Sequence, residues 1–287
     1  YGHTDSIFVG LGDDLTPEEC AERAKELGTI LTNACQETLK SKAVEVEAEV
    51  IMDRFYLPRR NRYAGRIIWD PSLEEPHSIA ELPVDDRIKM QGLEAKHTNT
   101  AKVGREAQIE SIKLIWDDEE PEVVLNMLRD MISSVRNGER PANDLIARAR
   151  LGKWLPSDVD HPHYGQGATN TSATPDAKDE TDQCYVRLSG NQKGAAWHNI
   201  VLANEVYPSL DKGDSFGFTF VKSGPTWIPT GGYVGFHDLS QIEDYELDID
   251  MIIQKNIIDK LDHIMYGIGL DKRMLLDEKV WDMDDFL

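Results

Sequence analysis

The first nine residues of the chain have the composition of a turn that can hold a divalent metal ion. They read YGHTDSIFV and place Asp5 on a tight turn that leads into an apolar strand, Ile7 to Val9. Mg²⁺ prefers oxygen ligands in proteins, commonly one or two carboxylates together with substrate phosphates. A carboxylate in this position suits phosphoryl transfer assisted by two metal ions. An ordinary hairpin turn, with Asp and Ser as turn formers, is the alternative.

A second chemically distinctive segment is basic. Five arginines and no acidic residue lie between Arg54 and Arg66, in a chain with 31 basic residues, 52 acidic residues and a net charge of −21. Overall acidity argues against nucleic-acid binding, because affinity for phosphate comes from Lys and Arg. The local excess of Arg nevertheless indicates a phosphate-facing patch, since a guanidinium can bind phosphate through two parallel hydrogen bonds. A solvated basic hairpin is the alternative interpretation of this segment. The acidic composition of the whole chain suggests a halophilic source, because high salt screens charges over short distances.

Patterns around these segments predict the elements that position them. A capping box, TPEE, starts a predicted amphipathic helix over residues 17–40. Residues 44–50 alternate apolar and acidic side chains, which predicts a half-buried strand that continues to Leu57. Residues 63–69 read as its hairpin partner. The first 70 residues therefore read as strand, helix, strand and strand.

The remainder of the chain is mostly helical in pattern. We predict helices over residues 98–116, 121–138, 141–151, 197–206 and 247–270, and a strand over 215–221. The polar segment 157–183 reads as a flexible loop or insertion. No apolar run is long enough to cross a membrane, and no signal peptide is visible. The three cysteines form no CxxC pair, and Cys20 and Cys35 fall in a helical pattern, which predicts buried thiols of a reducing compartment. We therefore expect a cytoplasmic protein.

The opening string resembles YGDTDS, the third palm motif of family B DNA polymerases of the archaeal, viral and eukaryotic type. The second Asp of that motif is a metal ligand in the family, and the resemblance assigns this role to Asp5. His3 stands where the family has its first Asp. The resemblance thus implies a site for Mg²⁺ at this turn, with one departure that bears on activity.

The basic segment resembles a second family motif. Residues 60–65, RNRYAG, are similar to KKRYAG, whose basic side chains contact the primer–template duplex near its growing end. On this resemblance Arg60, Arg62 and Tyr63 are duplex contacts. Asn61 replaces a family Lys, which puts one minor-groove contact in question.

Two weaker resemblances flank that motif. Residues 44–49 are similar to LELEFE, in which one acid lies near the active site; Glu49 is the first candidate and Glu47 the second. The passage from Gly92 resembles GxE…KexQ, where the palm gives way to the thumb. It implies contacts to the duplex backbone, and a structural role of Glu94 in capping or ion pairing is the alternative. The implied contacts are Lys96, Lys102 and Arg105.

The resemblance implies an α+β fold, the end of an antiparallel-sheet palm followed by a mainly helical thumb. Residues 1–86 would be the palm part and residues 87–287 the thumb, with the insertion near 157–183. The tail 280–287 resembles a sliding-clamp motif. Its candidate clamp-binding residues are Met283, Phe286 and Leu287.

The implied activity is template-directed addition of dNTPs to primer–template DNA by two-metal phosphoryl transfer. The family motifs DxxSLYP and KxxxNSxYG, which supply the first Asp and the triphosphate-binding helix, do not occur in this sequence. We therefore expect the C-terminal part of a nucleotidyltransferase that is inactive alone and is completed by an upstream part. The resemblance also implies a nucleoid-associated protein. The alternative is a catalytically inactivated paralogue that binds DNA or has a structural role in replication.

Overall fold

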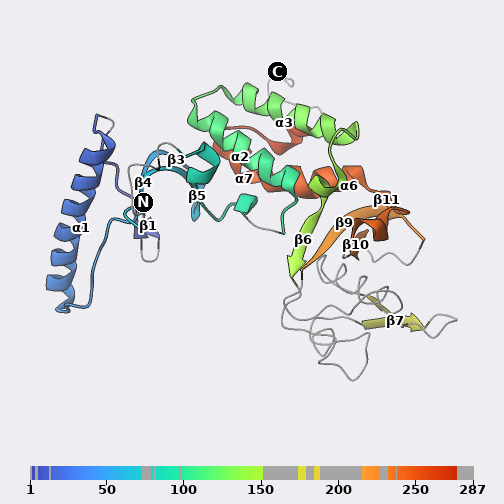
Figure 1. Cartoon of the computed structure of the whole chain (residues 1–287), viewed down its shortest axis with the longest axis horizontal. Coiled ribbons are helices and arrows are strands. Elements are labelled where there is room, and N and C mark those ends of the chain that lie inside the picture. The colour runs from blue at the N-terminus through green and yellow to red at the C-terminus, as the bar shows by residue number, and fades with distance from the viewer. Residues whose placement is uncertain are drawn as a thin grey trace, which may run out of the picture. The chain divides into compact units, whose positions relative to one another are not determined.

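A computed structural model describes most of the chain. The described residues are 2–3, 6–12, 14–72, 79, 82–96, 99–150, 174–178, 184–187, 215–225, 232–236 and 238–276. They form two compact units: unit 1 comprises residues 1–93 and 112–119, and unit 2 comprises residues 94–111 and 120–287. α-Helices occur with antiparallel strand pairs, which confirms the predicted α+β class (Figure 1).

Unit 1 contains one long helix and short antiparallel strands. The strands are β1 (Gly2–His3), β2 (Ser6–Ile7), β3 (Ile51–Arg59), β4 (Arg62–Trp69) and β5 (Ile88–Gln91). β1 pairs with β2, and a second sheet has the order β3-β4-β5. The 3₁₀ helix η2 (Val84–Arg87) leads into β5.

Helix α1 (Pro17–Leu39) begins at the predicted capping box. The Thr16 side chain accepts a hydrogen bond from the Glu19 N–H, and the Glu19 carboxylate accepts one from the Thr16 N–H. The N-terminal half of α1 packs on the sheet through Cys20 and Ala21, which lie against Ile51 and Trp69. The sequence prediction of this helix is confirmed, because its signals are all local.

The predicted strand over residues 44–50 is extended but belongs to no sheet of the described chain. The Val46 N–H donates to Thr32 Oγ1 at 2.8 Å, and Gln36 Nε2 donates to the Val44 carbonyl at 2.9 Å. Side chains of α1 thus bond the backbone groups that a neighbouring strand would otherwise take. Residues 44–50 alternate between half-buried and exposed as predicted, but the segment lies against a helix instead of a strand.

Unit 2 combines α-helices with a small sheet. Its α-helices are α2 (Lys102–Trp116), whose residues from Ile112 onward are assigned to unit 1, α3 (Pro121–Arg136), α6 (Ile249–Ile253) and α7 (Asp259–Gly267). A π-helical turn, η7 (Gln254–Ile258), joins α6 to α7. The 3₁₀ helices are η3 (Glu94–Lys96), η4 (Ala142–Leu145), η6 (Leu239–Ile242) and η8 (Lys272–Leu275).

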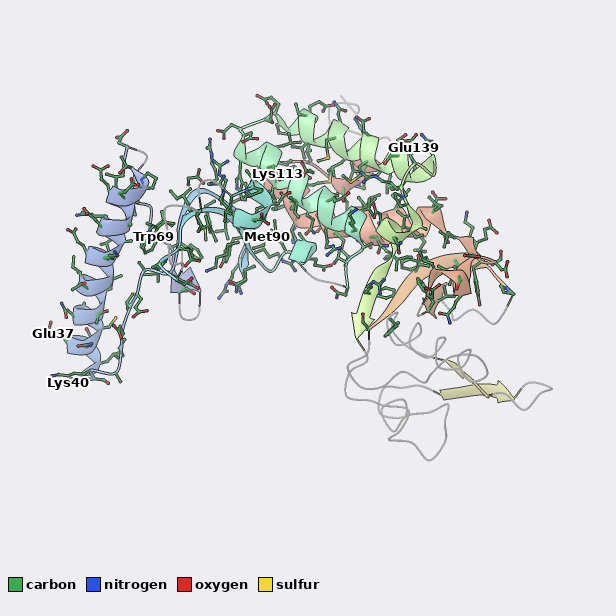
Figure 2. All side chains as sticks on the ribbon, viewed as in Figure 1. Glu37, Lys40, Trp69, Met90, Lys113 and Glu139 are labelled. Carbon is green, nitrogen blue, oxygen red and sulfur yellow. The ribbon has the colours of Figure 1, made fainter. Side chains whose placement is uncertain are left out.

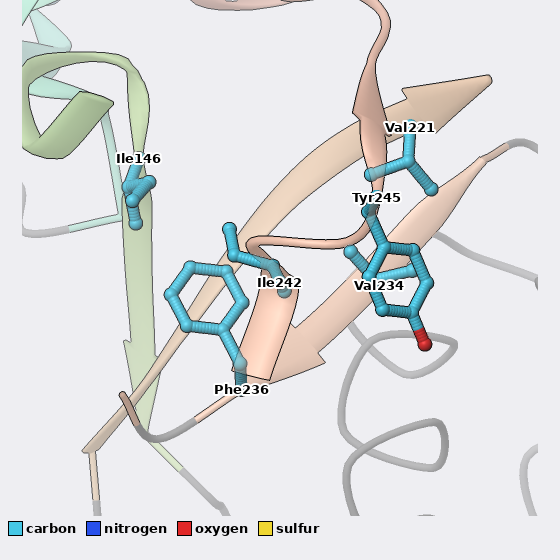
Figure 3. Packing of buried hydrophobic residues seen from close by; sticks show 6 residues of the cluster. All are labelled: Ile146, Val221, Val234, Phe236, Ile242 and Tyr245. Carbon is cyan, nitrogen blue, oxygen red and sulfur yellow. The ribbon is translucent and has the colours of Figure 1, made fainter. Parts of the chain in front are cut away.

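The sheet of unit 2 is antiparallel. Its strands are β6 (Ala147–Arg150), β9 (Ser215–Ser223), β10 (Tyr233–Phe236) and β11 (Glu246–Leu247), all paired to β9. Helix α6 packs against both α3 and β9. A separate hairpin pairs β7 (Thr174–Lys178) with β8 (Cys184–Arg187), so part of the segment predicted as a loop is a strand. An apolar cluster on the four-stranded sheet includes Val221, Val234 and Phe236 (Figure 3).

The helix predicted over residues 141–151 is wrong. The segment forms η4 and then β6, whose residue Ala147 is the ladder partner of Phe218 in β9. Pairing with a strand distant in sequence therefore overrides the local helical pattern. The final predicted helix is present as α6, η7 and α7, whereas the helix predicted at 197–206 lies outside the described residues. Among the residues the structure describes, no helix has the length and apolar character needed to cross a bilayer.

Candidate nucleic-acid interface

The tip of the β3–β4 hairpin presents the predicted duplex-binding motif. Arg59 and Arg62 are ladder partners, so Arg60 and Asn61 form a two-residue turn between the strands. Asn61 has a φ of 62°, in the left-handed region that Asn adopts more readily than most residues. The replacement of the family's Lys by Asn thus suits the turn conformation. Arg60 is exposed at the tip.

The arginines of the basic segment differ in their partners. Arg66 binds Asp53 through two nitrogens, with Nε–Oδ1 at 2.9 Å and Nη2–Oδ2 at 2.6 Å. The hydrogen bonds that Arg66 donates to Asp53 raise the pKa of Arg66 above its ordinary value. Arg54 Nη1 lies 3.3 Å from Asp118 Oδ2. Arg54 and Arg66 thus have acidic partners within the protein. The phosphate-facing patch predicted over residues 54–66 is therefore confined to the arginines near the hairpin tip.

Arg62 and Tyr63 are held by neighbours of the hairpin. Arg62 Nη1 donates to the Gly92 carbonyl at 2.8 Å, and it forms no ion pair with a described residue. Tyr63 is 4% exposed. Its ring centroid lies 4.9 Å from that of Phe8 and 5.4 Å from that of Phe55. Tyr63 therefore packs the hairpin against Phe8, the residue that follows β2.

The acids predicted near a metal site do not converge in the described part of the chain. Glu49 Oε1 lies 3.0 Å from Lys89 Nζ, and the Glu49 side chain is 75% exposed. Glu47 is also exposed. Asp5 itself lies outside the described residues, as does the geometry of its turn. No group of three His, Cys, Asp or Glu suited to a metal ion occurs among the residues described.

Lys102 at the start of α2 is surrounded by carboxylates. Its Nζ lies 3.1 Å from Asp144 Oδ1 and 3.5 Å from Glu106 Oε1. The hydrogen bond to Asp144 raises the pKa of Lys102. Arg140 Nη1 also binds Glu106, at 2.9 Å. Internal ion pairing therefore competes with the predicted contact of Lys102 to a duplex.

Arg105, one turn farther along α2, has a different environment. Its side chain forms no ion pair with a described residue, and its buried Nε has no hydrogen-bond partner there. Of the predicted contacts on this passage, Arg105 is thus better placed than Lys102 to bind an anion. The side chain of Lys96 lies outside the described residues, although its backbone forms the end of η3.

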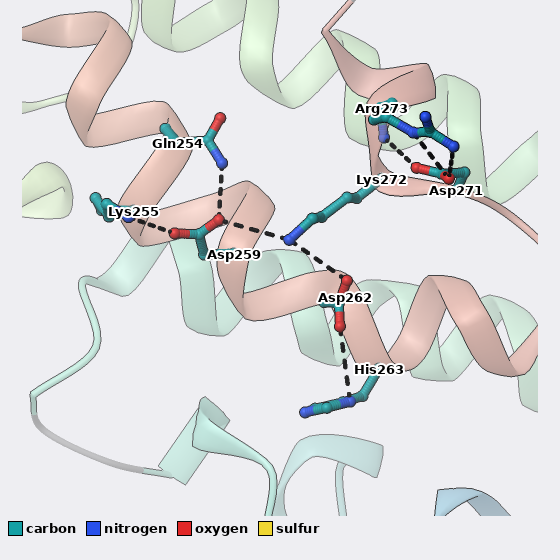
Figure 4. Close-up of polar contacts among 8 residues, drawn as sticks. All are labelled: Gln254, Lys255, Asp259, Asp262, His263, Asp271, Lys272 and Arg273. Carbon is teal, nitrogen blue, oxygen red and sulfur yellow. Dashed lines mark hydrogen bonds and ion pairs between the residues drawn. The ribbon is translucent and has the colours of Figure 1, made fainter. Parts of the chain in front are cut away.

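An ionic cluster connects α7 to η8 (Figure 4). Burial raises the pKa of Asp259, but hydrogen bonds from Lys255 and Gln254 outweigh burial, so the pKa is below its ordinary value. Lys272 Nζ lies 3.4 Å from Asp262 Oδ1. The Arg273 guanidinium lowers the pKa of Asp271 to about 2. Most cations of this region are thus committed to carboxylates of the same chain.

Comparison with known proteins identifies the family. Residues 1–164 match the model of DNA polymerase family B. The chain belongs to DNA polymerase family B. It is 24% identical over 290 residues to a DNA polymerase of Archaeoglobus fulgidus, covering 100% of this chain and 30% of that protein. The chain thus spans less than a third of the length of this curated relative.

Among solved structures, this family B polymerase chain is similar to the family B DNA polymerase from the hyperthermophilic archaeon Pyrobaculum calidifontis. The TM-score is 0.46 at 17% identity, over 82% of this chain and 24% of that one.

Sequence reasoning missed one contact of this polymerase chain. Lys260 of α7 forms an ion pair with Glu94, and its carbonyl accepts a hydrogen bond from Gln108 Nε2 at 2.5 Å. The alternative of a structural ion pair for Glu94 therefore holds. No local pattern could name Lys260 as a partner of this passage, because even Gln108 is 152 positions away from it.

Proposed function

We propose that this chain is the duplex-binding C-terminal part of a DNA-directed DNA polymerase. In the proposed reaction, the 3′-hydroxyl of a primer attacks the α-phosphate of a dNTP and releases pyrophosphate. Family membership supports the reaction class. The observation that carries duplex binding is the hairpin tip, where Arg60 and Arg62 lie without an acidic partner among the described residues. Contacts to phosphate fix the position of a protein on a duplex, and arginine is suited to them.

The proposal assigns residues 1–86 to the palm and residues 87–287 to a thumb around the product duplex. Arg105 supports the second assignment, because no described acid neutralises it. Tyr63 supports the first, since its packing on Phe8 connects the hairpin to the residue that follows β2. Primer–template DNA, a dNTP and the upstream part of the polymerase are the partners in this proposal.

Asp5 would be the Mg²⁺ ligand of this chain. Bound Mg²⁺ supplies charge stabilisation at a transferring phosphoryl group. Two-metal sites need at least two convergent carboxylates, and Glu49 is engaged with Lys89. We therefore propose that the second carboxylate comes from the upstream part of the polymerase and that the isolated chain does not extend primers.

The test compares variants of the complete polymerase. Asp5→Ala should abolish nucleotide addition while primer–template affinity stays within about threefold, because affinity for a duplex comes from phosphate contacts elsewhere. Asp14→Ala, at an exposed acid nearby, is the matched control and should extend primers normally. Extension by Asp5→Ala within about tenfold of wild type would exclude a metal-ligand role.

A catalytically inactivated paralogue is the second candidate, and His3 favours it. This residue occupies the first acidic position of the family motif in β1, where it pairs with Ser6. Asn61 also departs from the family pattern, but its φ of 62° is one that Asn adopts readily, so this residue suits the hairpin turn whether or not catalysis is lost. His3→Asp should raise Mg²⁺-dependent extension if the departure limits activity. An unchanged rate would place His3 outside the metal shell.

A sliding clamp is the further partner in this proposal. The tail residues Met283, Phe286 and Leu287 lie outside the described part of the chain, so the proposal rests on their spacing. A peptide covering 277–287 should bind the clamp of the same organism. Affinity should fall for Phe286→Ala with Leu287→Ala, and a native peptide that does not bind at high micromolar concentration would exclude this partner.

A further inference from the structure

One lysine of α7 receives contacts from both ends of the passage 94–108. Lys260 Nζ forms an ion pair with Glu94, and the Lys260 carbonyl accepts a hydrogen bond from Gln108 Nε2 at 2.5 Å. Thr100 Oγ1 also donates to Glu94 Oε2, at 3.3 Å. All of these residues belong to unit 2. The passage is therefore fixed to α7 at its beginning and along α2.

Burial makes these contacts more durable than ordinary surface pairs. Thr100 and Gln108 are each 1% exposed. The Lys260 side chain is 24% exposed and that of Glu94 is 39% exposed. Salt screens partly buried charges less than fully exposed ones. Salt should therefore weaken the Lys260–Glu94 pair less than it weakens a fully exposed pair.

Lys255 provides a contrast on the same helical run. It pairs with Asp259 at 2.9 Å, and the two residues are four positions apart. Such a pair stabilises its own helix turn and fixes no other segment. Lys260 instead reaches across to Glu94, so removal of its charge should release a segment that is distant in sequence.

We propose that Lys260 is a positioning residue for duplex binding. Through Glu94 it fixes the backbone at residues 94–96, the start of the passage that carries Lys96, and in this way it supports contacts of the passage to the phosphates of a duplex. Its own ammonium is taken by Glu94, so its effect is indirect. The inference rests on the proposed binding of primer–template DNA by this chain.

The test measures binding of a labelled synthetic primer–template by fluorescence anisotropy over a range of salt concentrations. Lys260→Met should weaken duplex binding by about threefold or more. Lys260→Arg keeps the positive charge and should bind the duplex as tightly as the native chain. Lys255→Met removes the same charge five positions away and should leave affinity unchanged. Amide hydrogen exchange of residues 94–96 and 99–101 in the free chain should accelerate only in Lys260→Met, with circular dichroism of all variants unchanged.

Glu94→Gln separates positioning from direct phosphate contact. Removal of an acid next to a DNA-binding surface should strengthen binding if only electrostatics mattered. A positioning role predicts weaker binding, because Gln cannot hold the Lys260 ammonium as a carboxylate does. Tighter binding by Glu94→Gln would make Lys260 a direct phosphate ligand and would overturn the proposal.

The remaining outcomes distinguish this inference from the function on which it rests. If the native chain binds the duplex and Lys260→Met binds equally well, the positioning role is excluded and duplex binding stands. If the native chain binds no duplex at low salt, both duplex binding by this chain and the positioning role of Lys260 are excluded. Exchange that accelerates equally across the whole of Lys260→Met would indicate general destabilisation and would also exclude the positioning role.

Discussion

Arg60 at the hairpin tip and two lysines of the helical unit, Lys102 and Lys260, differ in their partners. At the tip, exposed Arg60 has no acidic partner among the described residues. In unit 2, Lys102 lies within 3.5 Å of two carboxylates, and Lys260 is paired with Glu94. Residue type alone does not separate these roles. In a chain with a net charge of −21, a basic side chain that has no carboxylate partner within the chain indicates a binding surface better than the presence of Lys or Arg alone.

The largest expected effect concerns the packing of the helical unit. A Cβ added at Gly104 would lie 1.8 Å from the Asn256 carbonyl oxygen, because α2 approaches the π-helical turn closely. Gly104→Ala should therefore lower the free energy of unfolding by about 3 kcal/mol, although Ala normally favours a helix. Urea denaturation measures this. Gly10→Ala, where no atom lies within 4 Å, is the control and should change little.

The next effect tests the hairpin tip. Arg60→Ala with Arg62→Ala should weaken duplex binding for every sequence and reduce the log–log salt slope by about two units. The control removes two arginines from helices, Arg23 of α1 and Arg136 of α3. Titrations at several salt concentrations give both quantities. An unchanged salt slope of duplex binding in the hairpin variant would show that the tip is solvated and contacts no phosphate. Arg60 would then not differ in function from the paired lysines of unit 2.

A smaller effect is expected at Lys102. Lys102→Met should lower Tm, because it leaves the nearly buried carboxylate of Asp144 without its cation. The salt slope of duplex binding should stay as in the native chain. Lys102→Met with Asp144→Asn should recover part of the lost Tm, as a calorimetric scan would show. A fall of the salt slope by about one unit in Lys102→Met would instead return this residue to the duplex interface.

The smallest effect is a titration in acid. The pKa of Asp271 is about 2, below the ordinary value of about 3.9, because of Arg273. A carboxyl group whose pKa is lowered in the folded state stabilises the fold at pH values above its ordinary pKa. This stabilisation is lost as the pH falls from about 4 toward 2. Carboxyl chemical shifts should report the low pKa, and Arg273→Ala should raise it. A titration near 4 in the native chain would contradict the ion pair.

The sequence predicted elements well where their signals are local. The capping box and apolar spacing of α1 give its start at Pro17 and its end within one residue. The segment 141–151 was mispredicted because the partner of Ala147 is Phe218, and no local pattern shows that ladder. For the candidate site, the hairpin was predicted from motif and charge. The engagement of Lys102 was not, because Asp144 lies 42 positions away.

The extended segment 44–50 has a consequence for the behaviour of the chain at high concentration. It runs directly into β3, an edge strand of its described sheet, and α1 bonds its backbone at Val44 and Val46. Such a stretch is a template for self-association through strand pairing. The acids at positions 45, 47 and 49 point to the exposed side of the alternation. Two copies aligned edge to edge would bring these like charges together, so the same residues that suggested an active-site acid also discourage aggregation.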